Sequence, residues 1–225
     1  MLTILIHYGL FYYRKRYHRG MMRRHAAVRY VWLSQLSLWA CLTVCTILMP
    51  HFLFERNEGG VSNYGVHALT VVPYSLAFGL GGTFLLMAAY HLPTLREIPR
   101  HRLQFVLAML GCLLLLVLLT TYPYKVNKFY NQLHIYTSTA LFVVELLTAI
   151  WMALRLAPDR IKLSLFTMQV FGSALSLLTL VGVLHVLFIS QFIVGVSFGA
   201  LLVRTMSQVM NGVSEHSGAK PLTQQ

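Results

Sequence analysis

Six long apolar stretches, separated by short loops, constrain this chain more than any other feature. They run approximately over residues 29–53, 67–91, 103–123, 133–155, 162–184 and 186–206. Each has close to the roughly 20 residues that an α-helix needs to cross the hydrocarbon layer of a bilayer. The sequence therefore predicts an all-α integral membrane protein, a single bundle of six transmembrane helices.

The composition agrees with lipid as the solvent of this chain. Of the 225 residues, 57% are hydrophobic and only 11% are charged, whereas an average soluble domain has about 25% charged residues. With so few charges, the apolar side chains cannot all be hidden from water inside a soluble core. A water-soluble fold is therefore excluded.

The distribution of basic residues predicts the orientation of the bundle. Fifteen of the 18 Lys and Arg residues fall on one side of the six spans, and three, Arg56, Lys125 and Lys128, fall on the other. Because basic loops stay in the cytoplasm, both termini are predicted to be cytoplasmic. We expect a basic cytoplasmic or interfacial segment at 1–28, a transmembrane domain at 29–206 and a flexible cytoplasmic tail at 207–225.

The net charge of +12 indicates membrane lipids as partners. The basic residues flank apolar spans, where they attract anionic head groups, and this position does not favour nucleic acid. The short outer loops also lack glycosylation sequons, which favours a bacterial inner membrane over a glycosylating compartment.

Glu145 is the sharpest candidate for a functional residue, because it lies near the middle of the fourth span. A carboxyl group at this depth costs about 2.5–3.5 kcal/mol on insertion scales, and such residues usually face a bundle interior or a cavity. His134 begins the same span, about 16 Å away and on nearly the same face of a helix. Together they predict a polar track that leads inward from the outer surface.

Four histidines, His51, His67, His134 and His185, fall at the outer ends of predicted spans. This pattern raises a metal or haem hypothesis, in which His67 and His134 would form an outer haem pair. The inner pair of a two-haem cytochrome is missing, and the three cysteines show no metal-ligand spacing. We therefore expect no cofactor, and a single haem or metal stays as an alternative.

The first outer loop is the most polar loop of the chain. It holds Glu55, Arg56 and Glu58, followed by Ser62 and Asn63. One interpretation is that Ser62 or Asn63 caps a second helix that begins near residue 66. The other is that the loop lies over an outward-facing polar pocket near the outer leaflet, to which His67, Lys128, His134 and Glu145 also contribute.

Small residues mark helix-packing seams. Gly195 and Gly199 form a G-x-x-x-G in the sixth span, and Gly79, Gly81 and Gly82 thin the second span. Such residues let two helices approach closely. Packing within the monomer is the simpler interpretation, and a homo-oligomer or a membrane-protein partner through Gly195 and Gly199 is the alternative.

The Ser-Asn-Tyr-Gly at 62–65 before the second span, with His134 at the start of the fourth, resembles the Frag/DRAM/Sfk superfamily of six-span membrane proteins and its uncharacterised prokaryotic relatives. The resemblance covers roughly residues 50–151. Members usually have Asp where this chain has Asn63. The resemblance implies a role in membrane-lipid or lipid-anchor biology, with Ser62, Asn63, Gly65 and His134 as the matching residues.

These observations leave several classes of function. The first is the binding or handling of a lipid, or a lipid-linked molecule, in an outward-facing polar pocket. The alternatives are a subunit of a larger membrane complex and a small proton-coupled transporter that uses Glu145. An enzyme is the least supported, because no nucleophile–base pair or phosphate-binding glycine loop is visible in the sequence.

Overall fold

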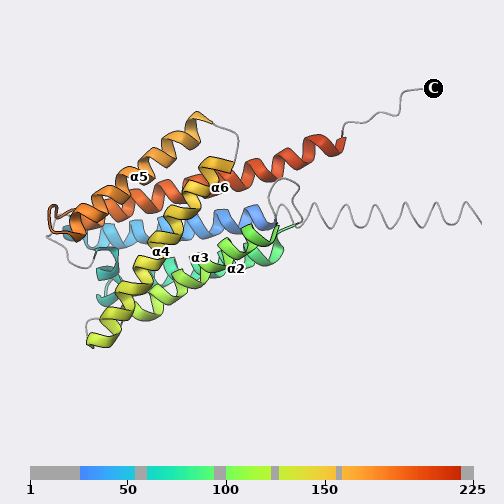
Figure 1. The fold of residues 1–225 in the computed structure, drawn as a ribbon. Helices are drawn as coiled ribbons and strands as arrows, with labels where there is room; N and C mark the ends of the chain where they lie inside the picture. The colour runs from blue at the N-terminus through green and yellow to red at the C-terminus, as the bar shows by residue number, and fades with distance from the viewer. Residues whose placement is uncertain (1–25, 54–59, 94–99, 123–126, 156–158, 219–225) are drawn as a thin grey trace, which may run out of the picture.

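The described part of the chain forms six long helices, and two short 3-10 helices lie between the first and the second of them (Figure 1). The computed structural model describes residues 26–53, 60–93, 100–122, 127–155 and 159–218. In chain order the elements are the N-terminal helix Ala26–Leu48, η1 (Pro50–Leu53), η2 (Gly60–Val66), α2 (Val71–His91), α3 (Arg100–Thr121), α4 (Lys128–Arg155), α5 (Arg160–Leu180) and α6 (Leu187–Gly218).

Successive helices run up and down the bundle, so that η1 and η2 lie at one end, here called the η2 end. In Figure 1 the N-terminal helix, in blue, and α6, in red, run through the middle of the bundle. The pair α2 and α3 packs on one side and α5 packs along α6, while α4 crosses the bundle obliquely. Half of the apolar window of α6 is buried, against 17% for α4, which makes α6 the central helix.

The surface of the bundle is that of a membrane protein. All six long helices are long and apolar enough to cross a bilayer, as the sequence predicted. Several of them carry large apolar side chains that point away from the bundle, including Leu154, Leu119 and Ile47, each more than 70% exposed. Exposure of this kind on every side of a bundle is stable in hydrocarbon and costly in water.

The predicted start of the second helix and its cap are wrong. Residues Gly60–Val66 form η2, and α2 begins only at Val71. Neither Ser62 nor Asn63 is the N-cap of α2, because Thr70 occupies that position, and the Thr70 hydroxyl donates to the carbonyl of Tyr64 at 2.7 Å. Short 3-10 turns are common before helices, and apolar patterns do not reveal them.

The last helix is longer than predicted. It continues to Gly218, where the sequence suggested a polar tail from residue 207. Val203, Met206 and Val209 are all buried, and their spacing of three places them on one face of a helix. The packing of this apolar face extends α6 beyond the strongly apolar span.

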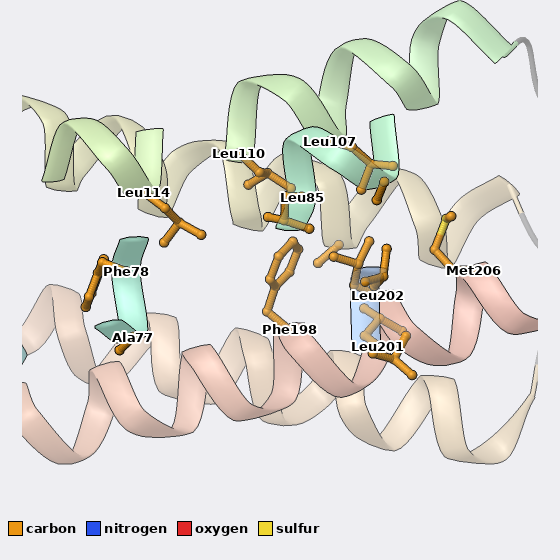
Figure 2. Packing of buried hydrophobic residues seen from close by; sticks show 14 of the residues in the cluster. Ala77, Phe78, Leu85, Leu107, Leu110, Leu114, Phe198, Leu201, Leu202 and Met206 are labelled. Carbon is orange, nitrogen blue, oxygen red and sulfur yellow. The ribbon is translucent and has the colours of Figure 1, made fainter. Parts of the chain in front are cut away.

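The hydrophobic core lies between α2, α3 and α6. Figure 2 shows Phe198 of α6 directed toward Leu85 of α2 and Leu110 of α3, with Leu107 and Leu202 beside them. A bundle in lipid cannot gain stability by removing helices from water, so close packing of this kind holds the helices together.

Glycines set the distance between α2 and α3. A Cβ atom on Gly82 would lie 2.8 Å from the carbonyl oxygen of Gly111. A Cβ atom on Gly111 would lie at the same distance from the carbonyl oxygen of Gly82. Gly81 in turn accommodates the side chain of Leu38, and Gly79 faces open space apart from Leu118. The predicted seam in the second span is therefore used for packing inside the monomer.

The G-x-x-x-G of α6 has two different environments. Gly199 is buried, and its Cβ position is occupied by the side chains of Gln35 and Trp39 from the N-terminal helix. Gly195 has nothing within 4 Å of its Cβ position. The predicted alternative of an oligomer through both glycines would require the face that the N-terminal helix covers at Gly199.

Candidate functional site

Hydrogen bonds and ring contacts hold the segment η2 against α6, η1 and the N-terminal helix. The backbone N–H of Val61 donates to the side-chain oxygen of Gln191 on α6 at 2.8 Å. Gly60, with φ of 55°, takes the left-handed conformation that glycine adopts without strain, and its Cα lies against the amide of Gln191. η2 is thus held against the start of α6.

Tyr64 anchors the other side of η2. It is fully buried, and its ring packs edge-on against Phe52 of η1 and Phe188 of α6. Its hydroxyl lies 3.4 Å from that of Thr46 on the N-terminal helix. Burial raises the pKa of the Tyr64 phenol, so this side chain stays neutral and acts as a structural anchor.

The predicted candidates Ser62 and His134 meet across the bundle. The hydroxyl of Ser62 lies 2.9 Å from Nε2 of His134, a residue 72 positions later in the chain. Ser138, one turn further along α4, lies 3.5 Å from the same nitrogen. His134 is only 6% exposed, so this histidine at the start of α4 is buried and joins α4 to η2.

Thr120 of α3 holds the other side of the His134 ring. Its hydroxyl oxygen lies 3.1 Å from Nδ1 of His134 and 3.2 Å from the hydroxyl of Thr137. It also lies 2.9 Å from the carbonyl oxygen of Leu116, to which it donates. Three elements, η2, α3 and α4, therefore converge on one imidazole.

A cavity of about 160 Å³ lies next to this cluster, inside the bundle. Its walls come from the N-terminal helix, η2, α2, α3, α4 and α6. Most of its lining is apolar, and the phenyl ring of Phe198 belongs to both the cavity wall and the core. The polar side chains that line it are Gln35, Trp39, Ser62, Ser138, Glu145 and Gln191.

Three polar groups of this lining have no hydrogen-bonding partner among the residues that the structure describes. Among the described residues, none pairs with the carboxyl group of Glu145 or the side-chain amide of Gln35, which is 3% exposed. The indole N–H of Trp39 is buried and likewise has no partner there. Unpaired polar groups in a low-dielectric interior are costly, and all three of these side chains line the same cavity.

The predicted site residues fall into three groups. Ser62, His134 and Glu145 belong to the cluster and its cavity, as described above. Asn63 is half-buried in η2, next to Ser62, and Lys128 is exposed at the first position of α4. Glu55, Arg56 and Glu58 lie outside the described residues.

The four histidines at the outer ends of the predicted spans have different surroundings in the described part of the chain. The His67 ring packs against Phe52, with ring centroids 4.9 Å apart, and His51 and His185 are exposed. Both ring nitrogens of His134 contact hydroxyl groups. In the ranges that the structure describes, no group of three or more His, Cys, Asp or Glu side chains could hold a metal ion.

Sequence reasoning missed several residues of this site. Gln35, Trp39 and Gln191 line the cavity, and Thr120 holds His134. Gln35 and Gln191 could have been identified from the sequence, since polar amide side chains are rare inside apolar spans and usually face the interior of a bundle. Thr120 carried none, because a threonine hydroxyl is satisfied by its own helix in most cases.

Comparisons with protein-family models, with curated proteins and with solved structures found no match. The resemblance at Ser62, Asn63, Gly65 and His134 therefore stays a prediction. In this polytopic membrane protein of six apolar helices, the candidate site consists of the Ser62–His134 cluster and the cavity that contains Glu145.

Proposed function

We propose that this protein binds a membrane lipid, or a lipid-linked molecule, in the cavity that contains Glu145. The observation that carries the proposal is an apolar intramembrane cavity with three polar side chains, Gln35, Trp39 and Glu145, that have no partner in the described part of the chain. Ligand sites in proteins have this composition, an apolar wall with a few polar groups that fix the orientation of the ligand.

The size of the cavity limits what enters it. A dry engineered cavity of about 150 Å³ accepts a molecule such as benzene, and this cavity measures about 160 Å³. It has room for part of a lipid, such as a length of acyl chain with one ester or hydroxyl group. The rest of the lipid would stay in the surrounding bilayer.

Glu145 favours a ligand with a hydrogen-bonding group. Its carboxyl group lies in an apolar wall. Burying the neutral acid, hydrogen-bonded to a ligand oxygen, therefore costs less free energy than burying an isolated carboxylate. Gln35 offers both a donor and an acceptor, and Trp39 offers a donor only. An ester, an amide or a hydroxyl group satisfies this set, and a purely aliphatic ligand does not.

Native mass spectrometry of the purified full-length protein tests this proposal. Wild type is compared with Glu145→Gln and Gln35→Leu, and with Thr83→Ala as a matched control on the exposed side of α2. We expect a retained lipid in wild type and in the control, and at least a tenfold lower occupancy in both cavity variants. Bare protein in all four, or equal lipid in all four, contradicts the proposal.

Proton-coupled transport is a second candidate, favoured by the single observation that no described residue pairs with Glu145. An unpaired intramembrane acid is typical of proton relays. Reconstitution into liposomes with an internal pH-sensitive dye separates the two functions. A Glu145-dependent pH change supports transport, and lipid retention without any pH change supports binding alone.

For the orientation we propose that both termini lie in the cytoplasm of a bacterial inner membrane, with the η2 end outside. The support is the count of 15 basic residues against three. Fusions of alkaline phosphatase, which is active only outside the cytoplasm, test it. We expect activity for a fusion in the loop after Leu53 and none for a fusion at the C-terminus; the reverse result overturns the orientation.

A further inference from the structure

The cluster around His134 has the geometry of a nucleophile and its base. We propose that Ser62 and His134 form a dyad that transfers acyl groups of ester lipids, with Ser62 as nucleophile and His134 as general base. The inference rests on the proposed function, because the ester must reach the cavity. It goes beyond binding, and no such pair was visible in the sequence.

The distance between the two groups suits proton transfer. Ser62 Oγ lies 2.9 Å from His134 Nε2, inside the range of about 2.6–3.2 Å that a base needs to take a proton from a serine hydroxyl. The competing hydroxyl of Ser138 is further away, at 3.5 Å. Ser62 is therefore the hydroxyl that His134 activates.

The third member of the cluster sets the tautomer of His134. The Thr120 hydroxyl donates to the carbonyl of Leu116 at 2.9 Å, one turn back in its own helix. Its oxygen, 3.1 Å from Nδ1 of His134, is then free to accept a hydrogen bond from the tautomer that carries its proton on Nδ1. With the proton on Nδ1, Nε2 is the basic nitrogen and faces Ser62. Thr120 is a positioning residue, in the place where a carboxylate stands in the well-known triads.

Ser62 is also accessible to a ligand and held in place. It lines the cavity, whereas His134 lies behind it and is 6% exposed. On the two sides of Ser62, Val61 is tied to Gln191 and Tyr64 is buried. A nucleophile on a fastened segment with its base already in contact needs little reorganisation before it reacts.

The acyl transfer needs only the groups that are present, together with water or an alcohol as the final acceptor. Ser62 Oγ attacks the ester carbonyl carbon, while Nε2 of His134 takes the hydroxyl proton. The bond to the leaving alkoxy oxygen then breaks, and His134 returns the proton to that oxygen, which leaves an acyl group on Ser62. Water or a lipid hydroxyl repeats these steps and releases the acyl group. Gln191, whose oxygen is held by Val61, offers its NH₂ group to the carbonyl oxygen.

A long-chain fluorophosphonate, which modifies activated serines, tests the dyad on the full-length protein in detergent. The adduct is counted by intact mass and located by peptide mapping. We expect one adduct on Ser62 in wild type, none in Ser62→Ala, and labelling roughly 100-fold slower in His134→Gln, since a general base contributes a factor of about 100 or more. Thr83→Ala, which removes a hydroxyl on the exposed side of α2, is the matched control and should label at the wild-type rate.

Thr120→Val gives a second test that leaves both reacting side chains in place. We expect slower labelling, with the same adduct on Ser62, because the tautomer is no longer fixed. No adduct on Ser62 in folded wild type, or equal rates in wild type and His134→Gln, overturns the dyad. Lipid retained without labelling leaves the proposed binding function standing, and labelling without retained lipid overturns that function alone.

Discussion

Asp159 and Arg204 join the start of α5 to α6 at the end of the bundle opposite η2. The Asp159 carboxylate caps α5 by accepting a hydrogen bond from the backbone N–H of Ile161 at 3.2 Å. The same side chain forms an ion pair with Arg204, whose Nε lies 2.6 Å from it, and it also accepts from Gln208 at 3.2 Å. One acid thus serves as helix cap and interhelical link.

Asp159 makes the stability of the bundle depend on acid pH. The Arg204 guanidinium, followed by the Ile161 N–H, holds the pKa of this carboxyl below its usual value of 3.8. The stabilisation is therefore fully present above about pH 5 and is lost as the pH falls through the lowered pKa, below 3.8. Thermal melting in detergent between pH 7 and pH 2.5 measures it.

Three variants separate the two roles of Asp159. Asp159→Asn keeps a capping oxygen and loses the charge, so we expect a lower melting temperature at pH 7 and a flatter acid dependence. Asp159→Ala loses both and should melt lower still. Arg160→Gln, an exposed neighbour, is the control for the loss of one surface charge next to this site. Equal melting of Asp159→Asn and Arg160→Gln at pH 7 would show that the ion pair adds nothing.

Gly82 should tolerate no side chain. Gly82→Ala places a Cβ 2.8 Å from the backbone oxygen of Gly111, and because backbone cannot rotate away, α2 and α3 must separate. We expect a loss of about 1–3 kcal/mol, as for other overpacked cores. The measurement is reversible unfolding in mixed micelles, with Gly79→Ala as control, where the nearest atom is 3.6 Å away. Similar losses in both variants would point to helix propensity or another common cause.

The hydroxyl of Tyr74 links α2 to α3 near the η2 end. It lies 3.0 Å from the hydroxyl of Thr121, and both residues are buried. Tyr74→Phe should lower the free energy of unfolding by about 1 kcal/mol, the usual net value of one hydrogen bond. Tyr90→Phe, at a position that is 75% exposed, should leave it unchanged. The same unfolding assay compares them.

Gly195 allows the cavity to be filled without disturbing the helices. It lines the cavity, and its Cβ position has nothing within 4 Å. We expect Gly195→Leu to keep the melting temperature of wild type and to lower lipid retention at least tenfold. Gly199→Leu should instead unfold the protein more easily, because Gln35 and Trp39 occupy that space. Undiminished retention in a folded Gly195→Leu would place the lipid elsewhere.

The sequence singled out candidate residues by their depth in the predicted spans. The position of Glu145 inside an apolar span pointed to a cavity, and Glu145 lines one. His134 was placed on the same helix, but its burial was not foreseen, because its partners Ser62 and Thr120 come from two other elements. Contacts between distant segments leave no trace in the periodicity of either segment.

The sequence by itself determined that this chain forms six membrane-crossing helices, because long apolar runs have no other stable form in a bilayer, where every backbone group must bond within its own helix. Only the tertiary structure decided that η2 is fastened between Gln191 and Tyr64, and that this brings Ser62 to His134 beside the cavity of Glu145. The physical reason is that helix formation depends on local hydrophobicity and backbone bonding, whereas this site depends on which helix faces come to pack together.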